Sequence, residues 1–424
     1  MPDPFPDAPP EPNRLHLADP RMRPWLPLTF VPGLDRINPP SRPWVFAVED
    51  RSLQLVWRAL GPGPVEVRAA DTVVHVETDG GPGSVVLDDL PPRTTLEVTL
   101  RGDGAVVTSP DGHTRPIPAH WRRLRATTLA SPPGAELFRF ATISDLHIGA
   151  TRFGYRGTMI ERPVPEVAHP IRAAAAAIDD LDAWGAQLLL VKGDLTDNGR
   201  AKDWDSVGRL LADCPIPVDM LPGNHDRYGA EGEPDPYDAL EHLGHDMTRH
   251  VKHLDVPGLR LILADSTSFG HRTGRIRYLE DPILALLTSS STPAFITLHH
   301  YAQRFPFPTF HPPGISSTEA NPFIRQVAAV KPTTMISSGH THRHRRRQVG
   351  PIVLTEVGSP KDYPGTWAGY VVHEGGIRQV VRRVSRPDIL RWTDYSAAAA
   401  LHAWGVWSPG WLSHRCFTHA WPAA

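Results

Sequence analysis

Hydrophobic positions recur at every second residue along much of the chain between residues 41 and 130. Leu53, Leu55 and Trp57 occupy alternate positions, and the stretch 96–100 repeats the alternation after a proline-rich corner. Successive side chains of a strand point to opposite faces of its sheet, so this pattern predicts half-buried strands. We therefore expect a small all-β sandwich domain over residues 41–130.

Beyond residue 137, short apolar runs alternate with longer stretches that have a helical pattern. Such runs predict buried strands, and the longer stretches between them predict helices. The predicted strands cover residues 137–143, 188–191, 218–221, 259–264, 295–298 and 334–336, the predicted helices cover 171–184 and 204–211, and β alternation returns over 351–383. This order is typical of strand–helix–strand units. We expect an α/β domain over residues 137–385.

The two ends of the chain have their own compositions. Residues 1–40 are rich in proline and predict an extended lead-in. Residues 386–424 hold five of the 12 tryptophans, namely Trp392, Trp404, Trp407, Trp411 and Trp421. Because indoles bury large areas, we expect this tail to pack on the α/β domain. A lid over a ligand is the alternative.

Charge and cysteine content exclude several classes of protein. The 44 Lys and Arg residues nearly balance the 46 Asp and Glu residues, which argues against a general nucleic-acid binder. Cys214 and Cys416 are too few and too far apart for a disulfide framework or a thiolate metal site. The amino terminus has no signal-peptide pattern, and no apolar run has the length of a membrane span. We expect a cytoplasmic protein without a membrane partner.

Residues that commonly bind metals follow five of the predicted strands directly. The segments are Asp145-Leu146-His147, Gly193-Asp194-Leu195-Thr196-Asp197, Gly223-Asn224-His225-Asp226, His299-His300 and Gly339-His340-Thr341-His342. Ligands at the carboxyl ends of successive strands converge on one crevice in open α/β sheets. Residues spaced i, i+2 at a strand end point to the same side, so the pair Asp145 and His147 can bind one ion.

These five segments, in this order, resemble the motifs of the calcineurin-like metallophosphoesterase superfamily. The family pattern is D-x-H, G-D-x-x-D, G-N-H-D/E, a single H after a strand, and G-H-x-H. The resemblance covers residues 137–385 and implies an α/β fold, a four-layer β-sandwich flanked by helices. The smaller amino-terminal domain resembles fibronectin type III sandwiches and the amino-terminal domain of purple acid phosphatases.

The resemblance implies a ligand set for two metal ions, which would be Mn, Fe or Zn. Asp145, His147, Asp194 and His342 would bind the first ion. Asp194, Asn224, His299 and His340 would bind the second, and Asp194 would bridge the two. His299 is preferred because the family ligand directly ends its strand. The family usually continues H-x-P, whereas Tyr301 follows here, so His300 stays an alternative.

The resemblance also implies roles for three residues that do not bind metal. His225 would face the phosphoryl group, where it stabilises the transition state or protonates the leaving oxygen. Asp197 and Asp226 would orient ligand histidines, and a loop or helix-cap role is the alternative for both. The nucleophile would be a hydroxide that bridges the two ions, with Asp194 as the shared ligand.

The resemblance predicts a metal-dependent phosphoester hydrolase. The segments around Asp194 and His225 look most like those of bacterial class III cyclic-nucleotide phosphodiesterases, so a phosphodiesterase acting on a small or nucleotide-type substrate is preferred. A phosphomonoesterase and a non-catalytic scaffold are the alternatives. The Pro/Phe-rich insertion 301–323 is expected to shape the substrate pocket. No feature identifies a protein partner for the amino-terminal sandwich.

Overall fold

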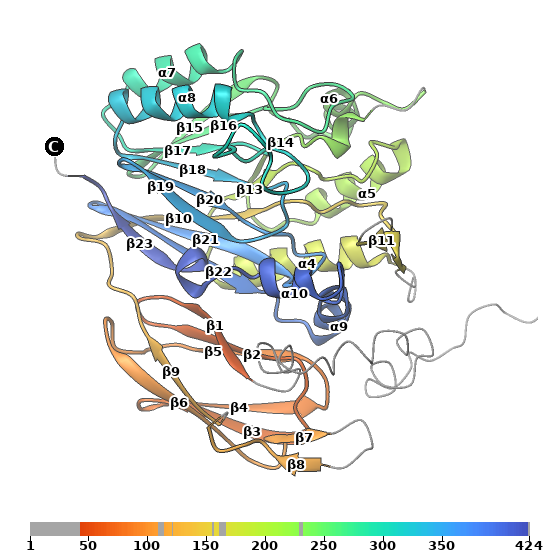
Figure 1. Ribbon diagram of the computed structural model, residues 1–424, viewed down its shortest axis with the longest axis vertical. Coiled ribbons are helices and arrows are strands. Elements are labelled where there is room, and N and C mark those ends of the chain that lie inside the picture. The colour runs from red at the N-terminus through yellow and green to blue at the C-terminus, as the bar shows by residue number, and fades with distance from the viewer. Residues whose placement is uncertain are drawn as a thin grey trace, which may run out of the picture. The chain divides into compact units, whose positions relative to one another are not determined.

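A computed structural model describes residues 43–108, 114–120, 122–154, 157–160, 167–228 and 232–422 (Figure 1). The expected lead-in over residues 1–40 lies outside these residues. The contacts divide the chain into two compact units. The first holds the described residues of Met1–Ala130, Arg152–His169 and Ser385–Val406, and the second holds those of Ser131–Thr151, Pro170–Val384 and Trp407–Ala424.

Two antiparallel sheets make up most of the first unit. One has the order β1-β2-β5, and the other has the order β4-β3-β6-β9. The strands are β1 Trp44–Val48, β2 Leu53–Trp57, β3 Pro62–Ala69, β4 Thr72–Asp79, β5 Gly83–Leu87, β6 Thr95–Arg101 and β9 Arg123–Thr127. The alternating pattern thus predicted β2 and β6 correctly, and their apolar side chains are buried. The expected all-β architecture of this region is confirmed.

Shorter elements complete the first unit. Two strand pairs are β7 Val106–Thr108 with β8 Thr114–Pro116, and β11 Arg152–Phe153 with β12 Met159–Ile160. Helix α9 covers Pro387–Ser396, and α10 covers Ala403–Trp407. The Trp404 ring lies 5.7 Å from that of Phe153. The first part of the tryptophan-rich tail therefore groups with this unit, and the domain boundaries drawn from the sequence stay a prediction.

The second unit contains two six-stranded mixed sheets. The first has the order β14-β13-β10-β21-β22-β23. Its strands are β10 Glu136–Ile143, β13 Leu189–Lys192, β14 Val218–Leu221, β21 Thr366–His373, β22 Gly376–Arg383 and β23 Phe417–Ala420. Strands β10, β13 and β14 run parallel, so their carboxyl ends meet at one edge. Strand β23, from the end of the tail, was not predicted and pairs with β22.

The second sheet of this unit has the order β15-β16-β17-β18-β20-β19. Its strands are β15 Val251–Val256, β16 Leu259–Ala264, β17 Ala294–Thr297, β18 Thr334–Ser338, β19 Arg345–Val349 and β20 Ile352–Glu356. The four inner strands are parallel and nearly all their residues are buried, which is why they appear in the sequence as short continuous apolar runs.

Helices pack against these sheets. They are α4 His169–Ala183, α5 Ala201–Ala212, α6 Pro236–His242, α7 Glu280–Thr288, α8 Ser317–Val330 and α11 Leu412–Arg415. Figure 1 shows α7 and α8 side by side over the sheet that contains β17 and β18. Ile283 of α7 and Phe323 of α8 share one apolar core with Ile296 of β17. Near the end of α4, the Trp184 indole lies against Gly369 of β21.

Aromatic rings fill the space between the two sheets. Phe140 of β10 lies 5.0 Å from Phe295 of β17, and Tyr370 of β21 stacks on Phe140 at 4.8 Å. Helix, sheet, sheet and helix therefore form successive layers, and the predicted four-layer α/β sandwich is confirmed. Among the described residues, no helix combines the length and the apolar character needed to cross a bilayer.

Gly369 is expected to be intolerant of a side chain. A Cβ atom there would lie 2.6 Å from the Trp184 ring. Gly369→Ala should therefore destabilise the protein by about 1–3 kcal/mol, as overpacked cores do. The melting temperature measures this loss. Trp184→Leu removes the ring that the new Cβ atom would meet. In that background Gly369→Ala should destabilise the protein less, and equal losses of stability in both backgrounds would contradict the packing argument.

Candidate metal centre

The predicted ligands lie where parallel strands of the two sheets end. Asp145, Asp194 and Asn224 follow β10, β13 and β14 of the first sheet, and His299, His340 and His342 follow β17 and β18 of the second. These six are buried or nearly so, as is His147, the seventh predicted ligand, which also follows β10. The face-to-face packing of the sheets brings these two edges together.

Several of these residues have an unusual backbone conformation. Asp145, His147, Asp194, His340 and His342 have φ values of 59°, 48°, 53°, 70° and 51°. Residues with a Cβ atom rarely adopt this left-handed region, and each instance costs about 1–3 kcal/mol. The chain bends sharply directly after each strand, and these bends turn the side chains toward one another.

A first group of ligand atoms surrounds His147. Its Nε2 atom lies 3.0 Å from Nε2 of His342 and 3.6 Å from Oδ2 of Asp194. Oδ1 of Asp145 lies 3.6 Å from Nε2 of His342. The four residues predicted for the first ion are thus within the reach of one cation.

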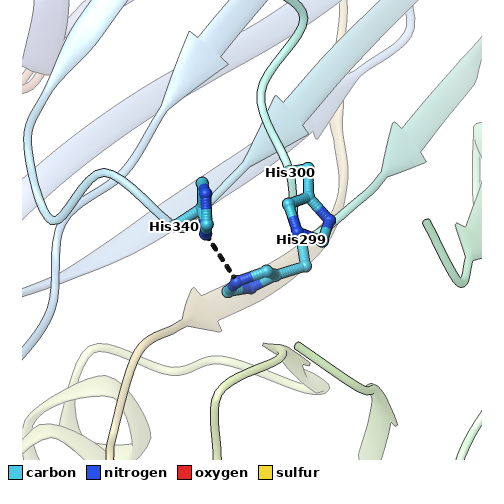
Figure 2. Close-up of side chains that lie close together, drawn as sticks. All are labelled: His299, His300 and His340. Atoms are coloured by element: carbon cyan, nitrogen blue, oxygen red, sulfur yellow. Dashed lines mark hydrogen bonds between the residues drawn. The ribbon is translucent and has the colours of Figure 1, made fainter. Parts of the chain in front are cut away.

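A second group surrounds His299. Its Nε2 atom lies 3.3 Å from Oδ2 of Asp194, 3.2 Å from Oδ1 of Asn224 and 3.1 Å from Nδ1 of His340. Figure 2 shows the His299 and His340 rings facing each other across the last of these contacts. Oδ2 of Asp194 takes part in both groups, as the predicted bridge requires.

The outer nitrogens of the second group fix which ring atoms carry protons. Nδ1 of His299 lies 2.8 Å from the Lys192 carbonyl oxygen, and Nε2 of His340 lies 3.2 Å from that of Pro313. A carbonyl only accepts, so both of these nitrogens donate. In the neutral rings, the two inner nitrogens then face each other with lone pairs at 3.1 Å. Two facing lone pairs repel unless a cation or a proton lies between them, so these residues fit a metal ion.

The first group repeats this arrangement with carboxylates as the acceptors. Nδ1 of His342 lies 2.7 Å from Oδ2 of Asp362, and Nδ1 of His147 lies 3.4 Å from Oδ1 of Asp197. The inner Nε2 atoms again face each other. Asp197 therefore has the predicted histidine-orienting position. Asp362 is buried and was missed, because it belongs to no motif and lies in a stretch recognised only as β.

His300 makes different contacts from His299. Its Nδ1 atom lies 2.9 Å from Oγ of Ser266, and its ring packs where a side chain on Gly274 would lie. His300 is also close enough to His299 and His340 to complete a group of potential ligands. In the described part of the chain, His299 is the one of these two histidines that contacts both Asp194 and Asn224, which favours the predicted ligand.

Comparison with known proteins agrees with this geometry. Residues 138–344 match the family model for calcineurin-like phosphoesterases. The chain contains a calcineurin-like phosphoesterase domain. Two curated relatives match part of the chain. A probable cyclic nucleotide phosphodiesterase of Psychrobacter arcticus is 28% identical over 166 residues, which are 38% of this chain and 58% of the relative.

The second relative is the 3',5'-cyclic adenosine monophosphate phosphodiesterase CpdA of Pseudomonas aeruginosa. It is 29% identical over 172 residues, 39% of this chain and 58% of the relative, so the chain spans less than two thirds of each curated relative. A purple acid phosphatase from yellow lupin is 12% identical, with a TM-score of 0.43. The match covers 82% of this chain and 73% of the phosphatase chain. That structural likeness is too distant to inform the activity.

Burial and mutual charge shift the pKa values of Asp194 and of the histidines around it. Burial raises the pKa of Asp194, but the nearby His299 and His225 outweigh burial and hold that pKa well below its ordinary value. For His299 the balance is reversed, because Asp194 outweighs burial and raises the pKa to about 9. Burial lowers the pKa of His147 to about 4, with His225 acting in the same direction. The central carboxylate is thus held in the ionised form that binds cations.

Asp226 differs from the histidine-orienting role expected for it. Its carboxylate accepts hydrogen bonds from the backbone N–H groups of Leu195, Thr196 and Gly223, at 3.2, 2.8 and 2.9 Å. Among the described residues, its carboxylate makes no hydrogen bond or ion pair with a histidine. Asp226 instead ties the loop after β13 to the loop after β14, which is the alternative role left open by the sequence.

His225 lies at the open side of the site. Its Nδ1 atom lies 2.7 Å from the carbonyl oxygen of Asp197, and its side chain is 30% exposed. The ring packs 4.4 Å from that of His147. Because a carbonyl accepts only, Nδ1 donates there, and Nε2 is the nitrogen left for a substrate. Its role toward the phosphoryl group stays a prediction.

Lys192 joins the two sheets beneath the ligands. Its buried Nζ atom crosses from β13 to β18 and donates to Oγ of Ser337 at 3.0 Å and to the carbonyl oxygen of Ser338 at 2.9 Å. Burial lowers the pKa of Lys192 to about 7, against the opposing effect of Asp145. Its carbonyl oxygen also accepts from His299. The charged residue before Gly193 thus supports the ligand loops from below.

The shared position of Asp194 can be tested by metal content. Asp194→Ala should remove an oxygen from both groups and release both ions, whereas His340→Ala should leave about one ion per chain, since only one group loses a ligand. Elemental analysis after dialysis measures this difference. Two retained ions in Asp194→Ala would show that the carboxylate is not the bridge.

The newly recognised carboxylate Asp362 provides a second test. Asp362→Ala removes the acceptor that orients His342, so affinity for one ion should fall about 10–100-fold, as for other residues that orient metal ligands. Titration of the metal-free protein with Mn²⁺ measures this change. Asp281→Ala, at an exposed carboxylate of α7, is the matched control. Unchanged affinity in Asp362→Ala would remove the orienting role.

Proposed function

We propose that the chain is a dinuclear metal-dependent hydrolase of phosphoesters. The observation that carries this proposal is two pairs of facing imidazole nitrogens, 3.0 and 3.1 Å apart within each pair, that share Oδ2 of Asp194 as a neighbour. Nitrogen and oxygen donors without sulfur suit Mn, Fe or Zn. When bound, two such ions activate water and neutralise phosphate oxygens.

The chain's own residues perform the remaining tasks. Asp194 holds both ligand groups in one arrangement, and Asp197 and Asp362 orient the histidines His147 and His342. His225 presents Nε2 to the substrate from the open side. It can then stabilise charge on the phosphoryl oxygens or protonate the leaving oxygen.

A diester is the preferred substrate class. Both curated relatives are named as cyclic nucleotide phosphodiesterases. The loop after His299 supports selection of a small substrate at this site. A bridge between Ala302 and Ile315 closes its base, the Pro313 carbonyl contacts His340, and the Phe305 side chain at its tip is exposed.

A substrate panel tests this proposal. Purified full-length protein loaded with Mn²⁺ is assayed on bis(p-nitrophenyl) phosphate, p-nitrophenyl phosphate, cyclic nucleotides and glycerophosphodiesters. We expect metal-dependent hydrolysis with diesters preferred. Preference for p-nitrophenyl phosphate would make the protein a monoesterase. Metal binding without turnover of any substrate would favour a scaffold.

His225→Gln separates two roles of that histidine. Protonation of the leaving oxygen matters for an alkoxide but not for p-nitrophenolate, which leaves without a proton. The variant should therefore keep both ions, lose little activity on p-nitrophenyl substrates, and lose about 10²–10⁴-fold on alkyl diesters. The kcat/KM values for both substrate types, measured with metal content in the same samples, check this expectation.

Two other outcomes would change the assignment of His225. Equal losses on both substrate types would mean that it stabilises phosphoryl charge without donating a proton. Loss of metal would mean that it is a ligand, in line with its closeness to His147 and Asp197.

A further inference from the structure

The side chain of Asn224 touches a tyrosine that no motif includes. Its Nδ2 atom donates to the Tyr228 hydroxyl at 2.7 Å, while its Oδ1 atom faces Nε2 of His299 at 3.2 Å. The half-buried Tyr228 lies one helical turn after Asn224, and its ring packs 4.6 Å from that of His225. The phenol therefore connects a predicted metal ligand to the residue that would face the substrate.

The direction of the hydrogen bond between Asn224 and Tyr228 depends on what the amide oxygen binds. An amide has a donor end and an acceptor end, whereas a hydroxyl can donate or accept. A cation binds the oxygen end only, so an occupied site forces Nδ2 toward Tyr228. The phenol oxygen must then accept, and its single hydrogen must point away from Asn224.

The surroundings of Tyr228 limit where that hydrogen can point. The Arg272 guanidinium lies over the ring, with its carbon 6.0 Å from the centroid, and a cation offers no acceptor. His225, whose side chain is 30% exposed, packs on another part of the ring, and the half-buried phenol can direct its hydrogen toward the same solvent-facing region. An oxygen atom of a bound phosphoryl group would supply an acceptor there, and the exposed Arg272 adds positive charge favourable to an anion.

We infer that Tyr228 is a substrate-binding residue that donates its hydroxyl hydrogen to a phosphoryl oxygen, in a direction fixed by Asn224 when that residue ligates a metal ion. This inference rests on the proposed function, because it takes a phosphoryl compound as the ligand. It adds a third polar contact to those expected from the metal ions and His225.

Binding of inorganic phosphate to the Mn²⁺-loaded full-length chain tests the inference. Tyr228→Phe keeps the ring against His225 and removes only the hydroxyl. The variant should keep two ions at saturating Mn²⁺, and its Kd for phosphate should rise about 10-fold, as expected for the loss of a hydrogen bond to a charged group. Tyr278→Phe, at a strongly exposed tyrosine of the same unit, is the matched control and should change nothing.

A second background tests the direction of the hydrogen bond. Asn224→Asp replaces the amide by a carboxylate, which only accepts. The phenol should then donate to that carboxylate, and its hydrogen is no longer available to phosphate. Adding Tyr228→Phe to Asn224→Asp should therefore leave the phosphate Kd nearly unchanged, an outcome that a purely structural role of the ring does not predict.

Several results would overturn the inference. They are an unchanged phosphate Kd in Tyr228→Phe, an equal rise in both backgrounds, loss of ions at saturating Mn²⁺, and a failure of the wild-type, metal-loaded chain to bind phosphate. The proposed function fails separately. A wild-type chain that binds ions and phosphate but hydrolyses no ester of the panel would refute the hydrolase, while the effect of Tyr228→Phe on binding would stand.

Discussion

The arrangement of this protein depends on lone pairs held close together around one buried carboxylate. Oδ2 of Asp194 lies within 3.6 Å of His147 and 3.3 Å of His299, and each of these histidines faces a second one. Acceptors behind the rings hold the protons on the outer nitrogens. Without a cation or an extra proton, the inner nitrogens repel one another. The surrounding fold must therefore be rigid enough to hold them in place.

That rigidity comes from the two packed sheets. Parallel strands with buried apolar side chains end at the same edge, and Phe140, Phe295 and Tyr370 hold the sheets together. Lys192 adds a polar link directly below the ligands. This support offsets the strain of the left-handed residues that follow the strands. The free-energy cost of the strained backbone and of the closely spaced nitrogens is thus offset by the packing of a large apolar core.

The open side of the site has a different character. His225 begins a short 3-10 helix, Tyr228 directly follows that helix, and Arg272 lies in a loop. They present donors and positive charge where a phosphoryl group would lie. Their contacts to Asp197 and Asn224 link them to the ligand groups. In the proposed function, binding of metal and orientation of the substrate are coupled through single hydrogen bonds, which small changes of side chain can test separately.

The sequence by itself determined the apolar strands that precede the motifs and the candidate ligands that follow them, because these apolar runs end directly in segments of metal-binding residues. It also indicated Asp194 as the shared ligand through the family resemblance. Only the tertiary structure revealed Asp362, Tyr228 and the role of Lys192, and it moved Asp226 from the histidines to the loops. These contacts join residues from different loops, and many join residues far apart in the chain. Sequence patterns record the local geometry of one strand and its bend, whereas such contacts depend on how the two sheets and their loops meet.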